Sequence, residues 1–263
     1  MRFAPAALLV CALGLAACGP TPPVTEGAAP ATSNFVPDIY KARVDTGPKG
    51  EAIEIPAIKA AYLRDRNTRT RVPYNGPESA GTVVVDPYAR VLYLVENGGM
   101  ATRVGIAVGK AGLGYSGTAT IQRKAHWPSW TPTANMVRTE PELYAQFAKG
   151  VPGGPSNPLG SRALYLYEGG RDTMYRIHGT MDPSSVGKAT SAGCIRLFNQ
   201  DVMDLYDRIP NGTVVKVRTA DESRRLEGPL RQTPDGYLEP VAAEVQPIAF
   251  AESTDYQAIP AAW

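Results

Sequence analysis

The 263-residue sequence contains few of the side chains that metal centres and disulfide frameworks require, with three cysteines and two histidines. Zinc sites usually draw their ligands from closely spaced Cys or His pairs. No such pair occurs, and a set built from His126, His178 and Cys194 would lack a fourth ligand. We therefore expect no metal ion, and we interpret His126, close to Trp127 and Trp130, as a packed and hydrogen-bonded side chain.

A strong net charge and a phosphate-binding loop are also missing. The formal net charge is +2, which gives no indication of nucleic-acid binding. The glycines between Gly109 and Gly114 are not followed by the helix that a phosphate loop needs. We expect no cofactor and no nucleic-acid partner.

Long apolar runs are absent as well, because the most apolar stretch, Ala6 to Leu15, is too short to span a bilayer. It follows the basic Met1-Arg2-Phe3, so residues 1–17 have the pattern of a secretory signal peptide. The Leu-Ala-Ala-Cys-Gly sequence that ends at Gly19 resembles the bacterial lipobox, which implies cleavage before Cys18 and lipidation of that cysteine. The alternative is a plain signal peptide that leaves Cys18 as a free thiol.

The resemblance to sorted lipoproteins, with Gly19 rather than Asp after the lipidated cysteine, implies a periplasmic protein anchored in the outer membrane. Residues 18–38 are rich in Pro, Thr, Ala and Gly and predict a flexible tether behind the anchor. Residues 39–80 form an N-terminal extension in which Ile53 to Ile58 can pack on the main domain. The charged run Arg64 to Arg71 is expected to be solvated, with contact to anionic lipid or glycan as the alternative.

The cysteine count favours chemistry at one position. Cys11 leaves with the signal peptide and Cys18 is lipidated, so Cys194 is the one thiol expected in the mature protein and no internal disulfide can form. An unpaired structural thiol is a liability in an oxidising compartment. A catalytic role for Cys194 is therefore favoured over inert packing.

From Thr82 the pattern changes to short β-branched runs separated by turn residues. Hairpin turns are predicted at 86–88 and 97–99. Strands dominate, so we predict a mostly β, sandwich-like mixed sheet with a few short helices as the catalytic domain, 81–218, followed by a C-terminal tail, 219–263. The predicted strands cover residues 82–86, 90–95, 102–108, 118–125, 163–167, 174–178 and 213–217.

Two helices are expected. One begins near Thr139, with Pro141 in its first turn, and the other has Asn199 as its N-cap. Beyond Asp221 no sustained period appears apart from residues 241–250. The loop from Gly150 to Gly160 is long and rich in Gly and Pro, which is typical of a functional loop, and we interpret it as one wall of a substrate cleft.

The chain is organised around His178 and Cys194, which lie 16 positions apart. This gap suits a strand that ends at His178, a loop, and a return to the end of that strand. A Cys–His pair that meets in the fold is the minimum for acyl transfer by a thiolate. Gly193 allows a sharp turn before the nucleophile, so that successive N–H groups can point at an oxyanion.

The run Ile177-His178-Gly179-Thr180, followed by Thr190-Ser191-Ala192-Gly193-Cys194-Ile195-Arg196-Leu197, resembles the signature of the L,D-transpeptidase (YkuD-like) family. Two further blocks, 130–136 and 153–166, are similar to its Gram-negative branch, and the resemblance covers 81–218. One departure is Ala192, where many relatives carry a second histidine.

The resemblance implies a peptidoglycan L,D-transpeptidase of the L,D-transpeptidase catalytic fold. Cys194 would attack the stem peptide, His178 would transfer the proton, and the carbonyl of Gly179 would orient the imidazole. The N–H groups of Gly193 and Cys194 would form the oxyanion hole. A carbapenem would form an adduct at the thiol. Candidate substrate-binding residues are Arg196, Ser191 and Trp130, with a structural salt bridge as the alternative role for Arg196.

Other functions stay open at this point. A hydrolase or L,D-carboxypeptidase could use the same Cys–His pair with water as the resolving nucleophile, and a non-catalytic wall-binding lipoprotein is a further alternative. The partners implied are peptidoglycan stem peptides and the membrane through the lipid anchor. The acyl acceptor is expected to be a neighbouring stem, which gives a 3→3 cross-link, or an envelope protein.

Overall fold

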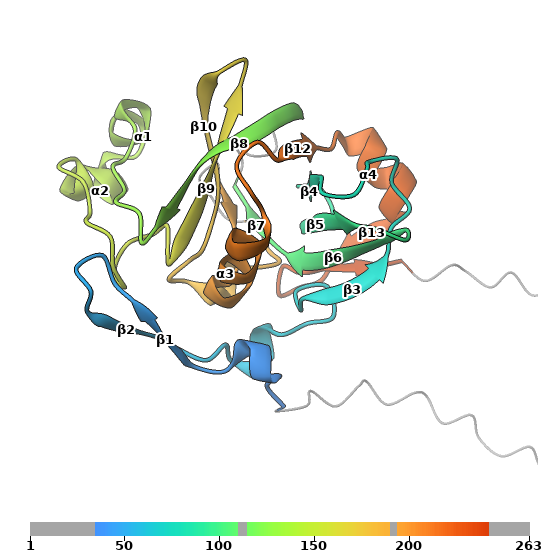
Figure 1. The fold of residues 1–263 in the computed structure, drawn as a ribbon, viewed down its shortest axis with the longest axis horizontal. Coiled ribbons are helices and arrows are strands. Elements are labelled where there is room, and N and C mark those ends of the chain that lie inside the picture. Colours follow the sequence, from blue (N-terminus) through green and yellow to red (C-terminus); the bar gives the residue numbers. More distant parts are fainter. Residues whose placement is uncertain (1–34, 110–114, 190–193, 242–263) are drawn as a thin grey trace, which may run out of the picture. The chain divides into compact units, whose positions relative to one another are not determined.

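Ten strands form one mixed sheet in the computed structural model, which describes residues 35–109, 115–189 and 194–241 (Figure 1). The strand order is β3-β6-β5-β4-β12-β8-β9-β10-β11-β7. The prediction of a mostly β, mixed-sheet domain with short helices is confirmed. The strands of this sheet are β3 Thr70–Pro73, β4 Val83–Asp86, β5 Val91–Glu96, β6 Met100–Gly105, β7 Ala107–Val108, β8 Gly117–His126, β9 Arg162–Glu168, β10 Arg171–His178, β11 Ile195–Arg196 and β12 Val214–Val217.

The sheet curls around its own core. β6 pairs with β3 and β5 near one end of the strand order, whereas β7 pairs with β11 at the other end. Because only Ile106 separates β6 from β7, the two ends of the sheet must come together. The enclosed core is built from the β-branched and leucine side chains that alternate along the strands, including Val83, Leu92, Val104, Ile121, Leu164, Ile177 and Ile195.

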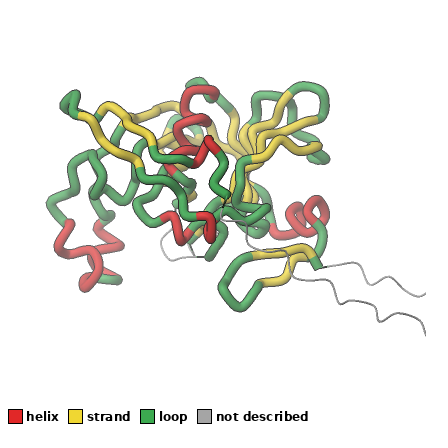
Figure 2. The backbone as a smooth tube through the Cα atoms, turned by 90° about the horizontal axis from the view of Figure 1, so that it is seen from below, coloured by secondary structure: helices red, strands yellow, loops and turns green. Residues whose placement is uncertain are grey.

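The helices are short, and α1 and α2 contact each other, whereas the strands run together (Figure 2). Helix α3 contributes Val202 and Leu205 to the core, and it contacts β9 and β10. In the part of the chain that the structure describes, no helix is long and apolar enough to cross a membrane. The helices are α1 Ala134–Thr139, α2 Pro141–Tyr144, α3 Asn199–Arg208 and α4 Ala220–Glu227, with 3-10 turns at Asp38–Tyr40, Ala60–Tyr62, Ala145–Phe147 and Pro183–Ser185.

The N-terminal extension packs closely on the sheet. The hairpin of β1 (Arg43–Thr46) and β2 (Ala52–Ile55) buries Ile53 and Ile55 against Trp127. Asp45 also forms a bidentate ion pair with the buried Arg162 on β9. The expectation that the isoleucines of this extension pack on the main domain is confirmed.

The expectation that residues 64–71 are a solvated charged run holds for Arg64, Asp65 and Arg71, which are exposed, and is wrong for residues 66–69. Asn67 is 3% exposed and donates hydrogen bonds to the carbonyls of Tyr62 and Val186. Arg66 forms an ion pair with Glu227, and Arg69 forms ion pairs with residues of α3. Sequence alone does not locate these carboxylates, because they lie more than a hundred residues further along the chain. The ion pairs of Arg66 and Arg69 therefore could not be predicted.

Helix expectations need three corrections. The helix expected from Thr139 is divided into α2 and a 3-10 turn, and α1 precedes it. Phe198, not Asn199, is the N-cap of α3. The C-terminal segment contains α4 and the hairpin of β13 (Leu230–Gln232) and β14 (Leu238–Pro240). Thr219 and Glu222 form a capping box at α4, which is a signal that the sequence carried.

Candidate active site

Strand register brings the predicted Cys–His pair onto one face. β10 and β11 are parallel neighbours, with His178 opposite Arg196 and Ile177 opposite Ile195. Cys194 directly precedes β11, so it shares a face with Arg196 because side chains alternate along a strand. Arg176, two residues before His178, faces the same way. The four side chains of Arg176, His178, Cys194 and Arg196 thus form one patch, while Ile177 and Ile195 point into the core.

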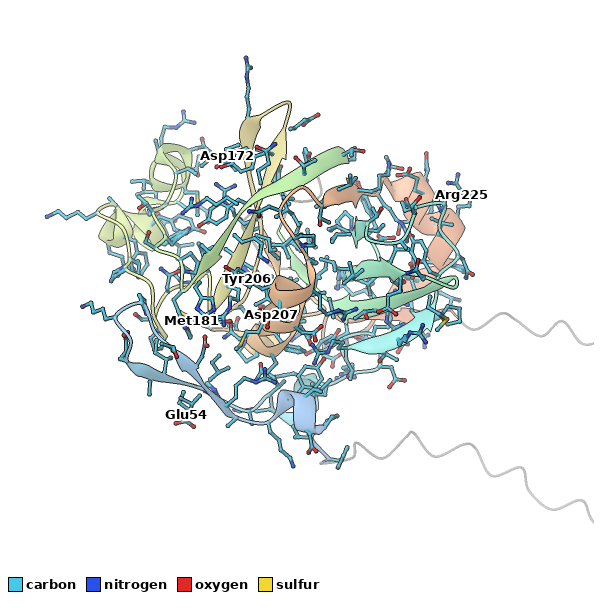
Figure 3. The ribbon with its side chains drawn as sticks, in the orientation of Figure 1. Glu54, Asp172, Met181, Tyr206, Asp207 and Arg225 are labelled. Atoms are coloured by element: carbon cyan, nitrogen blue, oxygen red, sulfur yellow. The ribbon has the colours of Figure 1, made fainter. Side chains whose placement is uncertain are left out.

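Arg176 is held by a row of side chains that crosses the sheet. Arg123 on β8 and Arg176 on β10 both pair with Tyr165 on β9. Their guanidinium groups lie over its ring at 4.2 and 4.4 Å from the centroid. Asp172 clamps Arg176 with two hydrogen bonds of 2.6 and 2.7 Å. Figure 3 shows Asp172 toward the tip of the β9–β10 hairpin.

Backbone irregularity accompanies this clamp. The pairing of β9 with β10 shifts register between Asp172 and Arg176, and Met174 within the shift has a φ of +64°. That conformation is costly for a side chain other than glycine. Asp172 accepts a hydrogen bond from the N–H of Met174 at 2.8 Å. The bulge therefore folds Asp172 back to a position from which it reaches Arg176.

His178 is neutral in this environment. It is 2% exposed, and its Nδ1 lies 2.5 Å from the carbonyl oxygen of Gly179. Burial, followed by the charge of Arg196, lowers the pKa of His178 to about 3, although the carbonyls of Gly179 and Leu159 favour the protonated form. Because a carbonyl only accepts, Nδ1 carries the ring proton. Nε2 is then the nitrogen that can accept a proton.

Cys194 is a half-buried free cysteine. Burial raises the pKa of its thiol, while the positive charges of Arg176 and Arg196 and the backbone N–H of Arg176 act in the opposite direction. A thiol with a raised pKa beside a neutral imidazole is a resting pair in which neither group is charged. The two arginines stabilise the thiolate once the proton has moved to the imidazole.

Asn199 organises the backbone that follows His178. Its Oδ1 accepts a hydrogen bond from the N–H of Ser161 at 2.9 Å, and its Nδ2 donates to the carbonyl of Thr180 at 2.9 Å. The amide lies so close to Gly179 that a Cβ at this position would clash with its Oδ1. The first residue of α3 thus ties the end of β10 to the 157–161 loop, and the absence of a side chain at Gly179 makes this approach feasible.

An aromatic cluster lies near the thiol. Trp130 is in contact with Tyr144 and Phe147, with ring centroids 6.2 and 5.9 Å apart, and it pairs through its backbone with Val151. The pKa of Tyr144 is raised by burial first, and by the nearby Glu140 and Cys194. Through Tyr144 the cluster therefore reaches the neighbourhood of Cys194.

The structure assembles some of the predicted site residues. His178, Gly179, Cys194 and Arg196 come together, and Trp130 lies in the adjoining cluster. Ser191, Gly193 and the lipidation candidate Cys18 lie outside the described residues. Their roles, like those of the other site residues, stay predictions.

His126 does not join the patch. It packs edge-on against Tyr206 with ring centroids 5.6 Å apart, and burial lowers its pKa. It pairs with Arg162 on β9, whereas Ala125, the neighbour that pairs with Ala163, lies in the row of His178. Across the described ranges, no group of three His, Cys, Asp or Glu side chains is placed to bind a metal ion.

Sequence reasoning missed Arg176, Asp172, Tyr144 and the bridging role of Asn199. A signal existed for Arg176, because it lies two residues before His178 on a predicted strand and must share its face. No comparable signal existed for Asp172, because its approach to Arg176 depends on the bulge. Tyr144 lies on a different element from the thiol, so only the fold brings it close.

Comparison with known proteins adds an independent finding. A family model described as the L,D-transpeptidase catalytic domain (YkuD) matches residues 80–217. The probable L,D-transpeptidase ErfK/SrfK of Escherichia coli strain K12 is 34% identical over 160 residues, which are 59% of this chain and 47% of that protein. The probable L,D-transpeptidase YbiS of the same strain is 34% identical over 165 residues, 60% of this chain and 50% of that protein. The chain therefore spans about half the length of these curated relatives.

Among solved structures, a crystal structure from Brucella melitensis, described as a probable carnitine operon oxidoreductase, is 50% identical to this chain. It covers 58% of this chain and 94% of its own, with a TM-score of 0.42.

Proposed function

The chain belongs to the L,D-transpeptidase catalytic-domain (YkuD) family, and on that basis we propose that it is a peptidoglycan L,D-transpeptidase with Cys194 as nucleophile. The observation that carries the proposal is the single face of β10 and β11 on which His178 and Cys194 are diagonal neighbours. Two arginines share this face and favour the thiolate.

In the first half-reaction, the thiol of Cys194 gives its proton to Nε2 of His178, and the sulfur attacks the carbonyl carbon of the third stem residue. The resulting tetrahedral oxyanion collapses, the C–N bond to the terminal D-Ala breaks, and His178 returns the proton to the departing amine. D-Ala leaves, and a thioester to Cys194 remains. The N–H groups of Gly193 and Cys194 are proposed as the oxyanion donors, a contribution of roughly 3–4 kcal/mol for one strong donor.

In the second half-reaction, an acceptor amine loses a proton to His178 and attacks the thioester carbonyl. The C–S bond breaks, the new amide forms, and His178 protonates the thiolate. The carbonyl of Gly179 stabilises each imidazolium that forms along this path, because it accepts a hydrogen bond from Nδ1. Arg196 is proposed to bind a stem carboxylate.

Products distinguish the proposed reaction from its alternatives. Purified protein is incubated with disaccharide-tetrapeptide, and the products are identified by mass spectrometry. Transpeptidation gives a cross-linked dimer with loss of D-Ala, whereas an L,D-carboxypeptidase gives a trimmed monomer. Cys194→Ser is the matched control, since it changes one atom, and it should abolish turnover without a large change in melting temperature. An active Cys194→Ser variant would contradict the assignment of the nucleophile.

The acceptor and the location are proposed from the sequence. Lipidation of Cys18 would hold the periplasmic domain near the outer membrane, and the favoured acceptor is the side-chain amine of a neighbouring stem. Cys18→Ala should release the protein from the membrane fraction. Deletion of the gene should reduce 3→3 dimers in the digested wall. Unchanged dimers, together with loss of wall-bound protein, would instead establish an envelope protein as acceptor.

A further inference from the structure

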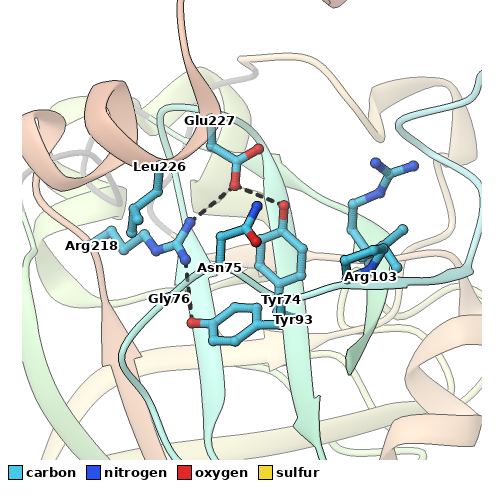
Figure 4. A pocket seen from close by; sticks show the side chains of 10 residues that line it. Tyr74, Asn75, Gly76, Tyr93, Arg103, Arg218, Leu226 and Glu227 are labelled. Carbon is cyan, nitrogen blue, oxygen red and sulfur yellow. Dashed lines mark hydrogen bonds and ion pairs between the residues drawn. The ribbon is translucent and has the colours of Figure 1, made fainter. Parts of the chain in front are cut away.

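A cavity with a volume of about 160 Å³ lies away from the Cys194 patch and shares no residue with it (Figure 4). Segments on both sides of the family-matched region 80–217 build most of it: five lining residues belong to 72–76 and three to 218–227. β5 and β6 supply the other two, Tyr93 and Arg103, which are opposite each other in the strand register. The lining residues are Val72, Pro73, Tyr74, Asn75, Gly76, Tyr93, Arg103, Arg218, Leu226 and Glu227.

The carboxylates at this cavity already have cationic partners. Arg218 is 2% exposed and forms ion pairs with Asp86 at 3.2 Å and with Glu227 at 3.0 Å. Arg66 forms an ion pair with the other oxygen of Glu227 at 3.1 Å. Glu227 also accepts a hydrogen bond from the hydroxyl of Tyr93 at 2.7 Å. Two arginines and two carboxylates therefore balance each other.

Arg103 has no such balance. Within the described ranges no carboxylate forms an ion pair with it, and its guanidinium donates a hydrogen bond of 2.7 Å to the backbone carbonyl of Asp65. Its Nε is buried and has no hydrogen-bond partner, as is also the case for the Nε of Arg66 and Arg218. A buried polar donor without a partner is costly, and a charged one more so. Burial first, and then the repulsion from Arg66, lowers the pKa of Arg103, whereas Tyr93, Glu227 and Asp65 act in the opposite direction.

The tyrosines at the cavity are neutral donors. Burial raises the pKa of both Tyr74 and Tyr93 far above neutral pH. Their hydroxyls are already used, since Tyr74 donates to the half-buried Glu78 and Tyr93 donates to Glu227. Figure 4 shows Arg218 and Arg103 on either side of the two rings, with Glu227 above them. Among the lining residues, the donors without a partner are therefore the Nε groups of Arg103 and Arg218, and Arg103 is attracted by Glu227 and Asp65 without forming an ion pair with either in the described ranges.

We propose that this cavity is a binding site for a small organic carboxylate, held by the guanidinium of Arg103. A carboxylate matches the planar guanidinium through two parallel hydrogen bonds, and it would give Arg103 the ion pair that it does not form within the described ranges. The volume corresponds to about five water molecules of ~30 Å³ each, which suits a molecule the size of acetate or an amino acid. Exposed Pro73 and Asn75 in the lining indicate that the cavity opens to solvent on that side.

Calorimetric titration tests the site without any measurement of activity. Acetate, D-alanine and inorganic phosphate are each titrated into the full chain carrying Cys18→Ala. Acetate or D-alanine should bind saturably with one site per chain, and Arg103→Gln should weaken binding at least about tenfold because a charge-assisted bidentate contact is lost. Arg71→Gln is the matched control: Arg71 lies on the neighbouring β3, is exposed, and pairs with Glu96. It should leave the affinity unchanged.

A rim variant keeps the test decisive should Arg103→Gln unfold the protein. Asn75 is exposed, so Asn75→Asp leaves packing intact and should weaken carboxylate binding by adding a negative charge at the cavity. Cys194→Ser should have no effect on binding. Absence of saturable carboxylate binding, binding of phosphate alone, equal affinity in the Arg103 and Asn75 variants, or loss of binding in Cys194→Ser would each overturn the proposal.

Discussion

Replacement of Arg176 by glutamine should raise the pKa of the Cys194 thiol and slow its reactions at neutral pH. Arg176 lies beside Cys194 on the same face, and its charge and backbone N–H both favour the thiolate. Asp172 holds the guanidinium in place but also opposes its charge. The size of the effect therefore depends on the difference between these two charges.

The magnitude follows from Coulomb's law. A unit charge about 6–7 Å from the sulfur, the spacing of cross-strand neighbours, contributes roughly 2.5 kcal/mol at an effective dielectric constant of about 20. The carboxylate of Asp172 is hydrogen-bonded to the guanidinium, so it lies at most about 10 Å from the sulfur and cancels roughly 1.7 kcal/mol of this. The remaining ~0.8 kcal/mol corresponds to roughly half a pKa unit, or about fourfold less thiolate at pH 7.

The assay is the rate of alkylation of Cys194 by iodoacetamide as a function of pH, in protein carrying Cys18→Ala so that one thiol remains in the mature chain. Arg123→Gln is the matched control, because Arg123 stacks on the other side of the same Tyr165 ring at a similar distance. It should lose comparable packing and leave the pKa of Cys194 nearly unchanged. Equal shifts in the two variants, or none in Arg176→Gln, would refute an electrostatic role for Arg176.

Three further outcomes are expected. His178→Ala should reduce kcat by roughly 10²–10⁴, the usual contribution of a general base, in the disaccharide-tetrapeptide assay; a smaller loss would indicate another base. Asn199→Ala should lower kcat more than it raises KM. In urea unfolding it should also destabilise the fold by about 1–3 kcal/mol for each backbone group left unpaired. An unchanged kcat would show that the hydrogen bonds of Asn199 to Ser161 and Thr180 do not position His178. Burial raises the pKa of Asp201 from 3.8 to about 7, so the wild type should lose folding free energy as pH rises through this interval and the buried carboxyl group must ionise. Asp201→Asn has no proton to lose there, so its free energy of unfolding should increase relative to that of the wild type. Urea unfolding at pH 5 and pH 7.5 tests this, and a difference between variant and wild type that shrinks over the interval would contradict it.

The sequence determined the family and much of the local structure. Alternating β-branched residues and turn signals located most strands of the central sheet, since a period of two is readable without tertiary information. The 16-residue separation of His178 and Cys194 predicted a strand, a loop and a return, and the parallel pairing of β10 with β11 has that form. The motif around Cys194 pointed to the family that the matching model identifies.

Contacts between distant segments were decided by the tertiary structure alone. Arg66 and Arg69 were predicted to be solvated because their partners, Glu227 and Asp201, follow more than a hundred residues later in the chain. Asn199 was predicted to be a helix N-cap because Asn is a favoured residue at that position. In the fold its side-chain amide instead forms hydrogen bonds with the backbone of Ser161 and Thr180. The preference of a residue for a position in a helix or strand is a local property, whereas its hydrogen-bond or ion-pair partner depends on the path of the whole chain.

The charges around the Cys194 thiol also depend partly on the sequence and partly on the tertiary structure. The sequence places Arg176 and Arg196 near the site by strand alternation and by the motif, but burial, which opposes the thiolate and depresses the pKa of His178, exists only when the sheet has curled around its core. Desolvation depends on every element packed around a group, so no single stretch of sequence encodes it. The residue types are local properties, and their protonation states at rest are a property of the complete fold.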